Sequence, residues 1–307
     1  MDIALALGGG GVRGVAHIGV LRALESHGFR IKAIAGTSAG GLVGAVYAAG
    51  KSTQEIEAAA KEMDHNRSFS RDSNDHPSLL GLASITKKLS ELLADRTFND
   101  LQIPFAATAV SLQSGKEIIL RKGKVLDAVL ATIAVPGVFP CKEIGEHVLM
   151  DGGVLDPVPV QVARWMHPSL PVVAVVLHQI PKDWSSNDTE LPLPIPAPAS
   201  IVEMLTKLRP VQAFKIFTRS MEVATKQLTE LSMQIYEPEV IIKPQVGHIG
   251  ILQNIDVEQI IKAGMDATEE AINEIKAEGN WVNNIRRQVK QRVFQEPRPE
   301  FWENIED

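Results

Sequence analysis

A serine with the surroundings of an enzyme nucleophile lies at position 38. The sequence Gly-Thr-Ser-Ala-Gly at 36–40 follows an apolar run at 31–35 and precedes a helix-like run of small residues at 41–49. In a nucleophile elbow the serine sits on a sharp turn from strand to helix, where the flanking glycines, here Gly36 and Gly40, avoid Cβ clashes. The positive end of the following helix favours an oxyanion there. An ordinary glycine-rich turn is the alternative, and the position between strand and helix favours the elbow.

A second glycine-rich loop lies between the first apolar run at 3–7 and the first helical pattern, which begins near Val15. Such a loop points several backbone N–H groups at one place, so it could bind a pyrophosphate or form an oxyanion hole. A dinucleotide site expects an acidic residue about 20 positions further on, and none ends the second strand. A Walker A ending is absent as well. We therefore favour an oxyanion hole, formed by the loop Gly9, Gly10, Gly11, Val12, Arg13 and Gly14.

A carboxylate that could act on this serine is Asp151, in the sequence Asp151-Gly152-Gly153. It ends a short apolar run at 147–150. An Asp-Gly turn without a function is the simple explanation. If the sheet is parallel, however, the carboxyl ends of its strands meet at one edge, and Asp151 lies at the same edge as the glycine loop and Ser38. A carboxylate in that position could accept the serine proton.

The three blocks together resemble the patatin-like phospholipase family, and most closely its compact bacterial members. The likeness runs over roughly residues 3–180 and includes the block Pro-Gly-Val-Phe-Pro at 136–140. The resemblance implies that Ser38 is the nucleophile, that Asp151 activates it, and that the loop at 9–14 is the oxyanion hole. The activity it implies is lipid acyl-ester hydrolysis, as in a phospholipase, lysophospholipase or esterase.

Two alternatives to a Ser-Asp dyad remain open. One is an α/β-hydrolase esterase with a Ser-His-Asp triad, for which His178 and His248 are the rival bases among eight histidines. The other is a lipid-binding or regulatory module whose hydrolase site is vestigial. Neither metal nor cofactor is required by the dyad scheme, in which Asp151 takes the proton of Ser38 and later activates water. The helix carrying Ile85 and Leu92 could line an acyl channel, although core packing is the favoured interpretation.

Composition restricts the partners and the compartment. With 31 Lys plus Arg against 37 Asp plus Glu, the formal charge is −6, and the basic residues are scattered, so nucleic acid is not an expected partner. A lone cysteine fits a reducing compartment. The N-terminus lacks a signal-peptide pattern, and no apolar run reaches the ~18 residues that span a bilayer. We expect a cytoplasmic protein that acts on a lipid or acyl ester, with transient contact to a membrane surface as an option. The oligomeric state is not determined by the sequence.

The pattern of apolar runs and helical segments predicts one α/β domain over 1–307. Its fold is expected to be a three-layer α/β/α arrangement with a mainly parallel central sheet, as in patatin. The catalytic core covers about 3–180, an exposed Pro-rich loop about 179–200, and a C-terminal helical part about 200–307. Strands are expected at 3–7, 31–35, 105–110, 117–120, 147–150, 172–177 and 239–242.

Overall fold

A computed structural model of the chain describes residues 1–65, 76, 78, 80–177, 209–251, 253, 255–280 and 283. The Pro-rich loop predicted at 179–200 lies outside the described residues, as does His178. The strands are β1 (Asp2–Leu7), β2 (Arg30–Gly36), β3 (Phe105–Ser111), β4 (Glu117–Leu120), β5 (Lys142–Ile144), β6 (His147–Asp151), β7 (Val172–Val175) and β8 (Val240–Ile242). The α-helices are α1 (Ala16–Ser26), α2 (Ala39–Ala48), α3 (Thr53–His65), α4 (Ala83–Leu93), α5 (Val125–Thr132), α6 (Val160–Met166), α8 (Arg209–Tyr236) and α9 (Val257–Ala277). Three short 3-10 helices are η1 (Gly11–Val15), η2 (Phe98–Asp100) and η3 (Gly152–Val154).

One mixed sheet forms the centre of the fold, with the order β5-β6-β3-β2-β1-β7-β8 and β4 paired to β3. The five strands β3, β2, β1, β7 and β8 are parallel to one another. β3 also pairs antiparallel with β4 and, past the end of β2, with β6, and β6 pairs antiparallel with β5. The mainly parallel sheet predicted from the sequence is confirmed, and the antiparallel margin with the short strand β5 was not predicted.

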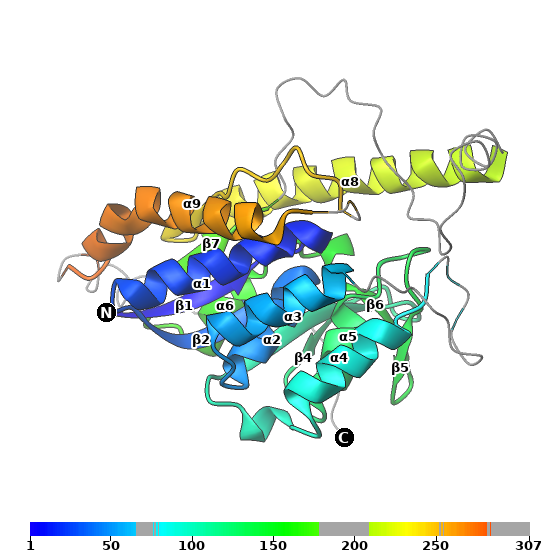
Figure 1. The fold of residues 1–307 in the computed structure, drawn as a ribbon, viewed down its shortest axis with the longest axis horizontal. Helices are drawn as coiled ribbons and strands as arrows, with labels where there is room; N and C mark the ends of the chain where they lie inside the picture. Colours follow the sequence, from blue (N-terminus) through cyan, green and yellow to red (C-terminus); the bar gives the residue numbers. More distant parts are fainter. Residues whose placement is uncertain are drawn as a thin grey trace.

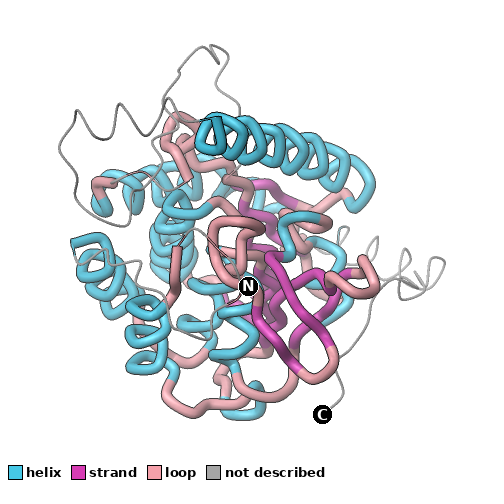
Figure 2. Tube along the Cα trace, turned by 90° about the vertical axis from the view of Figure 1, so that its right-hand side faces the viewer, coloured by secondary structure: helices cyan, strands magenta, loops and turns pink. Residues whose placement is uncertain are grey.

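Both faces of the sheet are buried, as the continuous apolar runs predict. Along β1, Ile3, Leu5 and Leu7 point into a large core shared with α1, α2, α5 and α9. The alternate residues Ala4 and Ala6 point to the other face, where they pack with α6 and half-buried side chains near the end of α8. Figures 1 and 2 show the resulting layers, with strands at the centre and helices outside. The three-layer α/β/α arrangement predicted from the sequence is confirmed.

In the C-terminal part, α8 runs without interruption from Arg209 to Tyr236. Pro210 stands in the first turn of the described helix, where the missing N–H has no intrahelical partner to lose. No helix among the described residues combines the length and the apolar character that crossing a bilayer requires.

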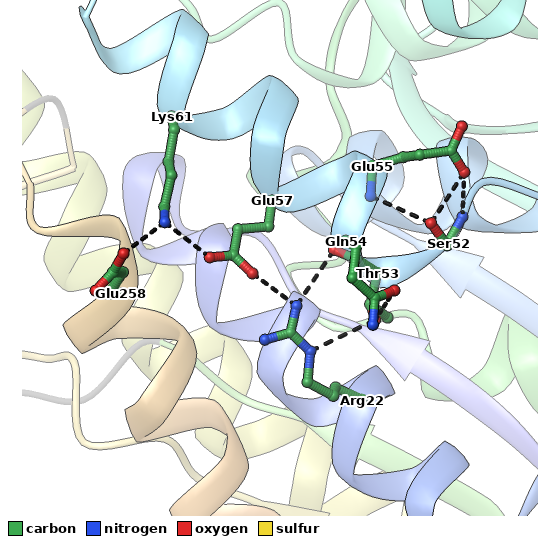
Figure 3. A network of polar contacts seen from close by, with 8 residues as sticks. All are labelled: Arg22, Ser52, Thr53, Gln54, Glu55, Glu57, Lys61 and Glu258. Carbon is green, nitrogen blue, oxygen red and sulfur yellow. Dashed lines mark hydrogen bonds and ion pairs between the residues drawn. The ribbon is translucent and has the colours of Figure 1, made fainter.

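A chain of ion pairs joins α3 to two other helices (Figure 3). Arg22 of α1 contacts Glu57 of α3 at 2.7 Å, and Lys61 of α3 contacts both Glu57 at 3.0 Å and Glu258 of α9. Because these side chains are partly exposed, each pair contributes only a few tenths of a kcal/mol, about 0.2–1. Together they hold α3 against α1 and α9, which matters because α3 forms a wall of the cavity described below.

The tightest helix contact, between α1 and α9, yields a stability prediction. A Cβ at Gly19 would lie 1.9 Å from the carbonyl oxygen of Ile261, so the two backbones touch. Gly19→Ala should lower the free energy of unfolding by about 1–3 kcal/mol, because α9 must shift. Urea unfolding followed by circular dichroism measures the change. Ser26→Ala, at an exposed position of the same helix, is the control and should change stability by less than about 0.5 kcal/mol. An unchanged midpoint for Gly19→Ala would contradict the contact.

Candidate active site

Ser38 stands at a strained turn between β2 and α2. Its φ of 53° and ψ of −124° lie outside the regions that side chains other than glycine favour. Its side chain is 8% exposed. Two residues on, a Cβ at Gly40 would lie 2.1 Å from the carbonyl oxygen of Leu7, so only glycine lets α2 start this close to β1. The predicted strand, turn and helix are all present.

Asp151 reaches this turn by a route that the sequence argument did not foresee. The prediction assumed a parallel strand, but β6 runs antiparallel to β3, with Asp151 opposite Ala109. β3 itself pairs with β2 at Ala107 opposite Gly36, so it continues past the end of β2. β6 therefore returns toward the sheet edge along this extension, and its last residue stops at the level of the elbow. The assumed strand direction was wrong, and the residue lies at the expected edge nonetheless.

The carboxyl group of Asp151 accepts a hydrogen bond from the Gly153 backbone N–H at 2.8 Å, and hydrogen bonding by the Ser38 side chain lowers its pKa. Only 5% of Asp151 is exposed. Burial raises the pKa of Asp151 to about 6, although both hydrogen bonds act in the opposite direction. A carboxylate with this pKa is a better proton acceptor near neutral pH than a free aspartate. Ser38 and Asp151 thus interact in a largely dry environment.

Three threonines that the sequence analysis missed support the elbow. The Thr132 hydroxyl, at the end of α5, accepts the Ser38 backbone N–H at 2.8 Å. The Thr37 hydroxyl donates to the backbone carbonyl of Asp156 at 2.9 Å and lies 2.7 Å from the hydroxyl of Thr108 on β3. All three threonines are fully buried. No local pattern in the sequence points to Thr108 or Thr132, because their roles arise only when β3 and α5 are placed beside the elbow.

A second buried carboxyl group lies behind the elbow. Asp156 is 7% exposed, and its carboxyl group interacts with that of Glu117 of β4, which is also buried. Burial raises the pKa of Asp156, so the pair favours a shared proton over two charges. The back wall of the site therefore carries less negative charge than its two carboxyl groups suggest.

The glycine loop faces the same site, and its backbone hydrogen bonds show which amides are already engaged. The N–H of Gly9 donates to Pro157, that of Val12 to Ile251 and that of Arg13 to Gly10. Among the backbone hydrogen bonds between described residues, none is donated by the N–H of Gly10 or of Gly11. Gly14 lies within η1, so among the described parts of the chain the amides of Gly10 and Gly11 are those of the predicted loop for which no backbone acceptor is found.

Arg13, the basic residue of the loop, is buried at 3% exposure and turned away from solvent. Its guanidinium donates to the carbonyl of Ile249 and forms an ion pair with Glu222 of α8 at 2.9 Å. Arg13 thus ties the glycine loop to the C-terminal part of the chain. A second anchor is His17, whose Nε2 lies 2.8 Å from the carbonyl oxygen of Gly8. Burial lowers the pKa of His17 to about 4, so the ring is neutral and donates this hydrogen bond.

An apolar cavity of about 380 Å³ opens onto these groups. Ser38, Asp151 and the glycine loop line it together with aliphatic side chains of α2, α3 and α4. Ile85, Leu89 and Leu92 of α4 line the cavity and also pack against the core, so both interpretations of this helix hold. Leu80 and Leu82 belong to a separate core cluster. The cavity matches an apolar ligand with one reactive polar group.

The histidines that the structure describes do not line this cavity. His248, one of the two alternative bases considered, is exposed, and the ring of His17 is hydrogen-bonded to the carbonyl oxygen of Gly8. Across the described part of the chain, no three His, Cys, Asp or Glu side chains are grouped so that they could hold a metal ion. The group that contacts the serine hydroxyl is the carboxyl of Asp151.

Comparisons with known proteins bear on this geometry. The model of the patatin-like phospholipase family matches residues 5–164, over half of the chain, including Ser38, Asp151 and the glycine loop. The chain belongs to the patatin-like phospholipase family. An uncharacterized NTE family protein of Mycobacterium bovis is 39% identical over 160 residues, which cover 51% of this chain and 44% of that protein. Patatin-like phospholipase domain-containing protein 7 of Rattus norvegicus is 33% identical over 171 residues, covering 53% of this chain and 13% of that protein.

Among solved structures, VipD from Legionella pneumophila is similar with a TM-score of 0.54 and 12% identity. The match covers 89% of this chain and 66% of VipD. At that identity the likeness supports the patatin fold. This chain spans less than half the length of the curated relatives it matches, including a second NTE family protein of Mycobacterium bovis that is 29% identical over 88% of this chain and 46% of its own length.

The support of the elbow by Thr132 can be tested directly. Thr132→Val keeps the shape but removes the acceptor of the Ser38 N–H, so the serine should lose its position. We expect labelling of Ser38 by a fluorophosphonate to slow by about 10- to 100-fold, as for reacting groups that shift by about 1 Å. Thr132→Ser retains the hydroxyl and should label nearly as fast as the parent protein. Equal rates for the valine and serine variants would show that this hydrogen bond does not position the serine.

Proposed function

We propose that this protein is a serine acyl-ester hydrolase that acts on lipids through a Ser38-Asp151 dyad. The contact between the Ser38 hydroxyl and the buried Asp151 carboxyl, within an apolar cavity, carries the proposal. Family membership supports the class of reaction. The apolar lining favours an acyl chain over a polar substrate, since burying it gains about 0.8 kcal/mol per CH₂ group.

The first half-reaction transfers the acyl group to the enzyme. Ser38 Oγ attacks the ester carbonyl carbon while Asp151 takes the hydroxyl proton. The carbonyl oxygen becomes an oxyanion, and the amides of Gly10 and Gly11 donate hydrogen bonds to it. Loss of one such donor typically costs ~10²–10³ in rate. The intermediate then collapses, the bond to the alcohol oxygen breaks, and that oxygen leaves with the proton held by Asp151.

The second half-reaction releases the fatty acid. A water molecule gives a proton to Asp151 and attacks the acyl carbon, so a second oxyanion forms in the same place. When this intermediate collapses, the bond to Ser38 breaks and Ser38 recovers the proton from Asp151. The products are the carboxylic acid and the free enzyme. Asp151 serves as base and acid in alternation, for which a pKa near neutrality is suited.

Substitution of the dyad tests the proposal. Ser38→Ala and Asp151→Asn should each reduce hydrolysis of p-nitrophenyl acyl esters and of phospholipid by at least ~10³-fold, because nucleophile or base is lost. Ser90→Ala, an exposed serine on α4, should leave the rate unchanged. His178→Ala and His248→Ala should retain activity. Loss of activity in either histidine variant points to a triad, and a parent protein without turnover or fluorophosphonate labelling points to a vestigial site.

The raised pKa of Asp151 predicts the acid limb of the pH profile. The ionised carboxylate is the form that accepts a proton, and its pKa is about 6. The ratio kcat/KM should therefore fall tenfold for each unit of pH below about 6 and level off above it. Rates with a p-nitrophenyl ester between pH 4.5 and 8 measure this, with circular dichroism at each pH as the control for folding. A limb centred near 4, the value of a free aspartate, would contradict a desolvated base.

A further inference from the structure

The helix α8 carries an unusual concentration of exposed apolar side chains. Among the described residues, seven large hydrophobic side chains are exposed, and five of them lie on α8. These five define the apolar stripe of α8: Ile216 (67% exposed), Phe217 (44%), Val223 (40%), Leu231 (51%) and Ile235 (69%). Their spacing places them on one side of the helix. Exposed apolar patches of this kind in proteins that otherwise bury such residues mark interaction sites.

The opposite side of α8 is held to the body of the protein. Glu222 forms the ion pair with Arg13, and Met233 and Tyr236 pack near α6. Figure 1 shows α8 as a long helix along the outside of the fold. These contacts hold α8 to the body of the protein, so the helix cannot rotate to bury the apolar stripe. The stripe therefore faces outward.

The stripe is continuous with the mouth of the cavity. Phe217 belongs to the stripe and also lines the cavity, as do its neighbours Thr218 and Met221 on α8. Leu155, another exposed apolar residue, directly follows η3, which packs against α8 and carries Gly153, the residue that donates its N–H to Asp151. Apolar surface thus leads from the outside of α8 to the entrance used by the substrate.

Four of the exposed residues between the apolar side chains carry no charge: Ser220, Ala224, Gln227 and Gln234. Glu230 is exposed and charged. The neighbouring charges Lys226 and Glu230 neutralise each other in an ion pair at 3.3 Å. An electrostatically attracted membrane helix would show a row of Lys or Arg instead. The surface suits insertion into a layer without net charge, and the chain's charge of −6 gives no attraction to anionic lipids.

We propose that the apolar stripe of α8 docks onto a neutral lipid surface and thereby places the cavity mouth against the layer that holds the substrate. The inference rests on the proposed function. A lipid with a chain of about ten CH₂ groups loses roughly 8 kcal/mol when it leaves the layer for water. Docking beside the mouth lets the acyl chain pass from one apolar phase to another without that step. A lipid surface is therefore the occupant that the function needs at this place.

The test measures vesicle binding apart from catalysis. Ser38→Ala protein is mixed with phosphatidylcholine vesicles and sedimented, alone and with Ile216→Glu plus Ile235→Glu. We expect the pair of substitutions to lower the partition coefficient at least about tenfold, since two inserted side chains become charged. The matched control is Gln259→Glu plus Asn273→Glu, which adds the same charge on exposed positions of α9 and should bind like the parent. Ile216→Gln plus Ile235→Gln repeats the test without new charge.

Soluble substrate separates the two proposals. With Ser38 intact, the α8 variants should hydrolyse a short p-nitrophenyl ester at the parent rate but act on phospholipid vesicles at least about tenfold more slowly. Unchanged vesicle binding in both α8 variants overturns the inference. A parent dimer that the same substitutions convert to a monomer, without vesicle binding, also overturns it and identifies a second copy as the occupant. Vesicle binding without ester hydrolysis would contradict the dyad while leaving the docking surface in place.

Discussion

The backbone at Ser38 adopts a φ of 53° and a ψ of −124°, a conformation that costs a residue with a side chain on the order of 1–3 kcal/mol. Contacts on every side of the turn hold it there. Gly40 allows α2 to begin against the end of β1, the Thr132 hydroxyl binds the serine N–H, and Thr37 is tied to the chain beyond Asp151. Since the turn sets the direction of the hydroxyl, both the contact with Asp151 and the distance to the glycine amides depend on this strain being maintained.

Much of this site could be predicted from the sequence because its chemistry lies in short motifs. The strand, the turn and the helix around Ser38 are encoded within about fifteen residues, and the glycine loop and the Asp-Gly-Gly block are equally local. Each motif predicts the backbone conformation of its own residues. What local patterns do not determine is strand direction, and Asp151 illustrates the difference. A parallel strand and an antiparallel one can both deliver a carboxylate to the same edge, so Asp151 lies where it was expected although the assumed strand direction was wrong. The residues that were missed, such as Thr132, act only across long separations along the chain.

The dyad combines two requirements that oppose each other. A serine needs a base with a pKa near neutrality, and a carboxylate reaches one only by losing water. Burial at 5% exposure raises the pKa of Asp151, while the hydrogen bonds from Ser38 and Gly153 keep the ionised form available. A more polar pocket would return the pKa toward that of a free aspartate. A fully apolar one would leave the carboxyl protonated at neutral pH. In the proposed mechanism, the apolar cavity serves both to bind the acyl chain and to make Asp151 basic.

The part of the chain beyond the family match completes the site. The match ends at residue 164, yet the glycine loop is held by Ile251, through the N–H of Val12, and by Glu222, through Arg13. Both partners lie in the C-terminal part, and α8 supplies one wall of the cavity. The part of the chain beyond the family match therefore helps to hold the loop that carries Gly10 and Gly11.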